Sequence, residues 1–68
     1  MKFLVVGLGS MGKRRIRCLK KLNFKNVYGF DLNKKRNLEA KTKYKIKTFS
    51  NFKEAYNKVK PDVLIIST

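Results

Sequence analysis

The chain has 68 residues, with eighteen lysines and arginines against four acidic residues and a formal net charge of +14 at pH 7. A chain of this length forms one small domain and buries only about 60% of the surface that its unfolded form exposes. One cysteine and no histidine exclude an internal disulfide and most zinc sites, so we predict no metal site and no catalytic residue. No segment approaches the ~20 apolar residues of a membrane helix, and we expect a soluble cytoplasmic protein.

The first predicted strand, residues 3–6, runs directly into glycines at positions 7, 9 and 12, and a helical pattern over residues 11–22 follows. A G-x-G-x-x-G motif between a strand and a helix is typical of dinucleotide-binding folds. In that interpretation Gly7 makes the turn, Gly9 leaves room for a pyrophosphate and Gly12 lets the helix pack close to the strand. The helix N-terminus then faces the phosphates. The alternative is that the glycines only shape a turn.

The predicted first helix has an apolar stripe that should face the sheet. Its members are Ile16, Leu19 and Leu22, with Met11 and Cys18 at the margins. We expect Cys18 to be a small core or half-buried residue. Arg15 falls within the stripe, so its side chain either reaches over the glycines toward the phosphates or lies along the sheet with its charged end in water.

The second predicted strand, residues 27–30, ends in Asp31, nineteen residues after Gly12. An acid at this position of a dinucleotide-binding fold accepts hydrogen bonds from the hydroxyls of the adenosine ribose. A carboxylate would also repel a 2′-phosphate, which favours NAD over NADP. Three basic residues, Lys34, Lys35 and Arg36, follow closely and can offset that repulsion, so NADP stays open. The alternative is that Asp31 only caps the next helix.

The rest of the chain continues the alternation of strands and helices. Asn33 is expected to cap a weakly amphipathic helix that ends near Thr42. Residues 44–49 alternate with period two, which predicts an exposed or edge strand. Asn51, paired with the glutamate three residues later, opens a third helix that Pro61 ends. Residues 63–68 form an apolar run of the kind buried on both faces of a parallel sheet.

This order predicts an α/β fold, a partial Rossmann doubly wound parallel sheet of four strands in the order 3-2-1-4 with three helices. The first and fourth strands would then lie side by side. Their carboxyl ends, at Gly7 and at Ser67 and Thr68, would flank the crevice in which such sheets bind ligands.

The net charge alone suggests a nucleic-acid or membrane-surface partner. The basic residues are spread through every segment, however, and no arginine-rich block or aromatic–basic repeat is present. We therefore interpret the charge as a compositional bias of surface positions, and expect neither a membrane nor a nucleic-acid partner. The alternatives kept open are a basic nucleic-acid-binding module, a nucleotide-dependent methyltransferase and an inactive fragment.

Three stretches, residues 3–15, 29–31 and 61–68, resemble the N-terminal NAD(P)-binding domain of the Gfo/Idh/MocA oxidoreductases. The resemblance implies a nicotinamide dinucleotide cofactor and hydride transfer to or from a sugar, cyclitol or similar hydroxylated substrate. By position, it implies cofactor contacts at Gly7, Gly9, Ser10, Met11, Gly12, Asp31, Ser67 and Thr68.

The family's catalytic lysine, its later histidine and its substrate domain have no counterpart in the chain. We therefore expect residues 1–68 to be a partial dinucleotide-binding domain that is inactive by itself. A substrate would bind only to a longer protein, and the oligomeric state is left without a prediction.

Overall fold

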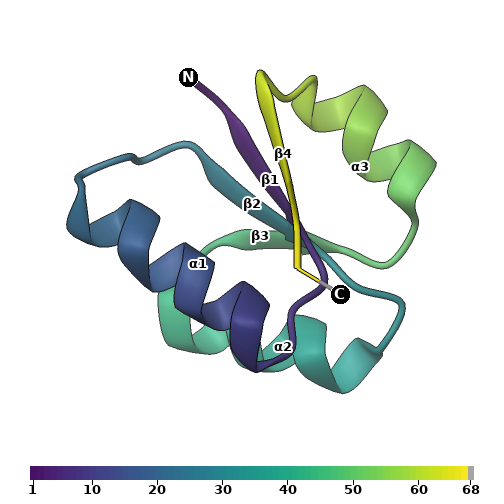
Figure 1. Cartoon of the computed structure of the whole chain (residues 1–68). Helices are drawn as coiled ribbons and strands as arrows, with labels where there is room; N and C mark the ends of the chain where they lie inside the picture. The colour runs from purple at the N-terminus through teal and green to yellow at the C-terminus, as the bar shows by residue number, and fades with distance from the viewer. Residues whose placement is uncertain (68) are drawn as a thin grey trace.

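Four parallel strands form one sheet with helices on both faces (Figure 1). The computed structural model describes residues 1–67. Along the chain the elements are β1 (Phe3–Val6), α1 (Ser10–Lys21), β2 (Val27–Phe30), α2 (Lys34–Tyr44), β3 (Lys47–Phe49), α3 (Phe52–Val59) and β4 (Val63–Ile66). The strand order is β3-β2-β1-β4. The predicted doubly wound sheet, with its order 3-2-1-4 and three helices, is confirmed.

The register of the central strands brings their carboxyl ends to one level. Val6, the last residue of β1, lies opposite Phe30 of β2 and Ile66 of β4. Asp31 and Ser67 therefore follow their strands at the same edge at which the glycine loop leaves β1. This edge includes the point between β1 and β4 where the strand order reverses, which is where open α/β sheets bind ligands.

Each face of the sheet has its own apolar core, because successive side chains of a strand point to opposite faces. The first core, under α1 and α2, contains Phe3, Val5, Leu8, Ile16, Leu19, Val27, Ala40 and Ile46. The second, under α3, contains Leu4, Phe30 and Ala55. The strand β1 therefore contributes buried residues to both layers and is the centre of the molecule.

The helix α1 confirms the predicted stripe only in part. Ile16 and Leu19 are buried, but Leu22 is 68% exposed because it follows the last helical residue as the C-cap. The expectation of a core or half-buried Cys18 is wrong, since the thiol is exposed. Cys18 comes two residues after Ile16, and about 100° of rotation per residue turns it away from the sheet.

The helix α2 is longer at its end than the sequence indicates. Its predicted cap is confirmed, because Asn33 Oδ1 accepts hydrogen bonds from the N–H groups of Lys35 at 2.9 Å and Arg36 at 3.1 Å. It continues to Tyr44, and Lys45 closes it in a left-handed conformation with φ of 55°. The predicted strand over residues 44–49 is therefore shortened to β3. Its edge position is confirmed.

The last helix and strand differ in how well they match expectation. Asn51 caps α3 as predicted, with Oδ1 accepting from Glu54 N at 2.9 Å.

The expectation that the last strand is buried on both faces is wrong, since Leu64 is 42% and Ile66 64% exposed. The strand β4 lies at an edge of the sheet, while α3 packs on β1, β2 and β3. The side chains of Leu64 and Ile66 are therefore left uncovered by the part of the chain that the structure describes.

Candidate functional site

A cavity of about 480 Å³ opens at the carboxyl edge of the sheet. This volume is within the range of small-molecule sites, roughly 300–1,000 Å³. The lining residues are Val6, Gly7, Gly9, Ser10, Met11, Phe30, Asp31, Leu32, Arg36 and Ser67. Most of the predicted site residues are therefore brought together here. Gly12 does not line the cavity, and Thr68 lies outside the described residues.

Two glycines of the loop are required by the fold itself. Gly7 leaves β1 with a φ of 98°, a conformation that residues with a Cβ rarely adopt. A Cβ on Gly12 would lie 1.8 Å from the carbonyl oxygen of Gly7, which no rearrangement of a side chain can relieve. The predicted turn at Gly7 and the close packing at Gly12 are both confirmed.

Gly9 is different, because nothing in the fold requires its missing side chain. A Cβ there would meet only the guanidinium of Arg36, with Cζ 3.7 Å away in ordinary van der Waals contact. Gly9 and Arg36 both line the cavity, and the backbone of Gly9 faces the guanidinium with no side chain between them. This is the property that a ligand approaching the backbone needs.

The helix α1 begins at this opening without a cap. Its N-cap residue is Gly9, no side chain caps it, and the first turn contains no acidic residue. The first N–H groups of a helix have no partner within the helix and carry the positive end of its dipole. Ser10 and Met11, in that first turn, also line the cavity, so an anionic group is favoured here.

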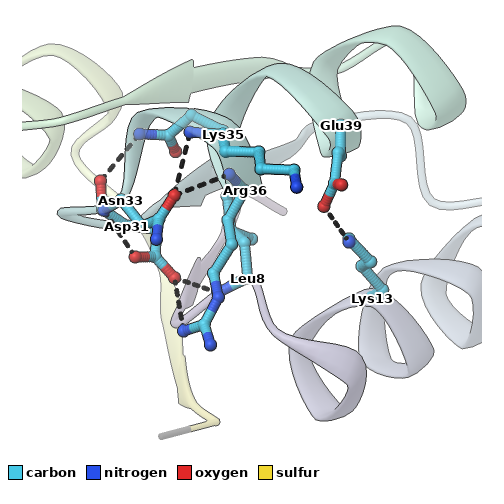
Figure 2. Close-up of polar contacts among 8 residues, drawn as sticks. Leu8, Lys13, Asp31, Asn33, Lys35, Arg36 and Glu39 are labelled. Carbon is cyan, nitrogen blue, oxygen red and sulfur yellow. Dashed lines mark hydrogen bonds and ion pairs between the residues drawn. The ribbon is translucent and has the colours of Figure 1, made fainter.

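Asp31 connects the glycine loop to the turn that leads into α2 (Figure 2). Its Oδ2 accepts a hydrogen bond from Leu8 N at 2.8 Å, and its Oδ1 accepts one from Asn33 N at 2.8 Å. Its main-chain oxygen accepts from Asn37 Nδ2 at 2.7 Å. The alternative that Asp31 caps the helix is wrong, because Asn33 is the cap. The bond to the glycine loop is a role that sequence reasoning missed.

The carboxyl group of Asp31 is only slightly exposed, yet it stays ionised. Burial by itself raises its pKa. The hydrogen bonds from Leu8 N and Asn33 N and the nearby charge of Arg36 act in the opposite direction and prevail, so that the pKa lies below its ordinary value. The side chain of Asp31 therefore carries a full negative charge at neutral pH.

Arg36 is the cation of the site. Its Nη1 lies 3.8 Å from Asp31 Oδ2, and its side chain is 53% exposed. Figure 2 shows the side chain running from α2 toward Asp31 and Leu8. Arg15, which the sequence offered as a phosphate contact, is exposed and does not line the cavity. The sequence did contain a signal that Arg36 borders the site. Arg36 lies three residues after Asn33, the cap of α2, and side chains in a first helical turn lean back toward the N-terminus.

Among residues 1–67, no group of histidine, cysteine, aspartate or glutamate residues could hold a metal ion. No helix in the same range is both long and apolar enough to cross a membrane.

Comparison with known proteins agrees with this geometry. A family model for oxidoreductases with an NAD-binding Rossmann fold, Gfo/Idh/MocA, matches residues 1–68. The chain belongs to the Gfo/Idh/MocA oxidoreductase family. As the NAD-binding domain of that family, it has the expected sheet order and places its glycine loop and Asp31 on one cavity.

One solved structure has the same fold as this chain. It is prephenate dehydrogenase from A. aeolicus in complex with hydroxyphenyl propionate and NAD+, with a TM-score of 0.89 and 27% sequence identity. The match covers 100% of this chain and 24% of that one, so the Gfo/Idh/MocA domain spans about a quarter of the length of this neighbour. Comparison with curated protein sequences gave no significant match.

Proposed function

We propose that the chain holds NAD along the carboxyl edge of its sheet, with the pyrophosphate at Gly9 and the start of α1 and the adenosine ribose at Asp31. The observation that carries the proposal is the cavity at the carboxyl edge, in which Gly9 presents its backbone with no side chain of its own and the guanidinium of Arg36 nearby. The other contacts proposed are those of Gly7, Ser10, Met11, Gly12, Ser67 and Thr68.

Asp31 retains the capacity to bind the ribose. Each carboxylate oxygen can accept more than one hydrogen bond, and Leu8 N and Asn33 N each use one. A hydrogen bond from a ribose hydroxyl to a charged acceptor contributes about 1.5–3 kcal/mol. The same negative charge repels a 2′-phosphate, so NAD is preferred to NADP.

Ser67 supports a ligand at the other side of the crevice. Its Oγ is buried and has no hydrogen-bond partner among residues 1–67, and the residue lines the cavity. A buried hydroxyl without a partner costs free energy. A hydrogen bond from a polar atom of the cofactor would satisfy this hydroxyl. Such a contact is expected at the carboxyl ends of β1 and β4, where the strand order reverses.

Within a longer protein, we propose that this domain serves hydride transfer on a sugar, cyclitol or similar hydroxylated substrate. The nicotinamide supplies the hydride donor or acceptor when it is bound, and the residues of this chain bind and orient the dinucleotide. Residues 1–68 would be the first part of the dinucleotide-binding domain, with the substrate domain outside them. Activity of the longer protein with cyclitols and aldoses, compared with prephenate, tests the substrate class. A cytoplasmic location stays a prediction that cell fractionation tests.

Calorimetric titration with NADH tests the binding site. Gly9→Asp places a carboxylate in the opening and should abolish saturable binding, while Gly9→Ala should weaken it and leave the fold intact. Asn57→Asp is the matched control, because it adds the same charge on the exposed side of α3. Undiminished NADH binding by folded Gly9→Asp would refute the proposal.

A further inference from the structure

We propose that Asn37 is a positioning residue of the nucleotide site, which holds Asp31 in the orientation that binds the adenosine ribose. The inference rests on the proposed function, since it needs the ribose hydroxyls at Asp31. It assigns a role in binding to a buried side chain of α2 that does not line the cavity at the carboxyl edge and acts through Asp31.

The main chain of Asp31 lies just beyond the end of β2. Toward β1, Gly7 N donates to Phe30 O at 2.8 Å, and toward β3, Asp31 N donates to Phe49 O at 3.2 Å. The carbonyl group of Asp31 comes after these ladder bonds, and a buried carbonyl group needs a donor. It receives one from a side chain, because Asn37 Nδ2 donates to Asp31 O at 2.7 Å.

The bond from Asn37 fixes the peptide group next to which the side chain of Asp31 extends. The carboxylate itself accepts hydrogen bonds from Leu8 N and Asn33 N, and both of these donors belong to loops. Asn37 belongs to α2, where its N–H group donates to Asn33 O at 3.1 Å in the regular helical pattern. The helix therefore holds the main chain of Asp31, and the direction of the carboxylate follows from it.

Asparagine at position 37 is unfavourable for stability in two respects. The residue is only 8% exposed, and its Oδ1 has no hydrogen-bond partner among residues 1–67. A buried acceptor without a partner costs free energy, and asparagine is less favourable than alanine or leucine inside a helix. An apolar residue would remove both costs and lose only the bond to Asp31. That bond is therefore the feature that accounts for the amide.

This balance separates a positioning role from a structural one. Asn37→Leu removes the donor to Asp31 and also removes the unpartnered Oδ1, so its two effects on stability oppose each other. Its effect on the ribose does not cancel, because the main chain of Asp31 is then free to turn. A positioning role predicts a loss of affinity that is confined to ligands with ribose hydroxyls.

The experiment is calorimetric titration of the purified chain, and of Asn37→Leu and Asn37→Ala, with ADP and 2′,3′-dideoxy-ADP. The two ligands differ only in the ribose hydroxyls. The wild type should prefer ADP by about tenfold or more, the range of a hydrogen bond to a charged acceptor. In both variants the preference should fall to about threefold or less, while the unfolding midpoint stays within about 5 °C of the wild type.

Ala40→Gly is the control for a general loosening of α2. Ala40 is buried one turn further along the helix, and glycine lowers helix stability at that position. The substitution leaves Asn37 and its bond to Asp31 in place. It should lower the unfolding midpoint and leave the preference for ADP unchanged.

The inference is overturned by a folded variant of Asn37 that keeps the wild-type preference for ADP, even if it binds both ligands more weakly. An equal loss of the preference in Ala40→Gly would also overturn it, since the effect would then come from a loosened helix. Failure of both Asn37 variants to fold would make the bond to Asp31 a structural contact, with the same consequence. A wild-type chain that binds the two ligands equally, or binds neither, would instead refute the proposed function.

Discussion

Asp31 has a structural function in this fold and, in the proposed NAD site, a binding function in the same carboxylate. It holds the glycine loop through Leu8 N, a residue 23 positions earlier in the chain, while it faces the cavity. In the proposed site, the orientation of the glycine loop and the recognition of the ribose would therefore be linked. Gly29, two residues before Asp31 in the chain, leaves room for Leu8, since a Cβ there would lie 2.9 Å from Leu8 Cδ2.

The substitution Asp31→Ser tests both functions. We expect weaker NADH binding and stronger NADPH binding, because the ribose loses an acceptor and a 2′-phosphate loses a repulsive neighbour. We also expect a loss of stability of about 1–3 kcal/mol, the cost of leaving the buried Leu8 N–H without a partner. Titration with both cofactors and chemical denaturation measure the two effects. An unchanged cofactor preference would exclude the ribose function, whatever the change in stability.

Among the secondary-structure elements, α2 and α3 both begin at an asparagine cap. They differ in whether their first turn lines the cavity. Asn33 and Asn51 make similar capping bonds at the starts of α2 and α3. Only α2 carries a residue of the cavity in its first turn, which is Arg36. The cap of α2 therefore positions a residue that lines the cavity, whereas the cap of α3 supports the opposite layer of the sheet.

We predict that Asn33→Ala and Asn51→Ala each lower the free energy of unfolding by about 1 kcal/mol, the usual cost of losing such a cap. Of the two, Asn33→Ala alone should also weaken NADH binding, because the turn between Asp31 and α2, which borders the cavity, loosens. Denaturation and calorimetric titration of both variants provide the comparison. Equal affinity for NADH in the two variants would show that the cap of α2 does not position the cavity residues.

At the scale of the whole molecule, the fold concentrates positive charge on one face. The crossovers place α1 and α2 on the same side of the sheet (Figure 1). These helices carry six and five basic residues, and Glu39 is their one acidic residue. Its ion pair with Lys13, at 2.7 Å, joins the two helices. Repulsion within this layer opposes the compact state.

We therefore expect added salt to stabilise the chain. The thermal unfolding midpoint should rise with sodium chloride, most steeply up to about 0.1 M, where the Debye length falls to ~10 Å. An uncharged solute at equal osmolality is the control, since it leaves the repulsion unscreened. A midpoint that is independent of salt, or that falls with it, would show that self-repulsion does not limit the stability of the fold.

Local signals in the sequence were sufficient for the sheet and for much of the site. The glycines at 7 and 12 and the caps at Asn33 and Asn51 have the predicted local roles, because backbone conformation and packing at these positions depend on neighbours in the chain. The exposure of Cys18 could have been found from its angle to Ile16. The uncovered face of β4 could not, since an apolar run does not show which helix covers it.

The sequence by itself determined the order of strands and helices, the turn of the glycine loop and the position of an acid after the second strand, because each depends on residue type and short-range spacing. Only the tertiary structure decided that Asp31 bonds to Leu8, that Arg36 and not Arg15 borders the cavity, and that the basic helices share one face. These contacts join residues far apart along the chain. Their geometry exists only once parallel strands and right-handed crossovers have brought those residues together.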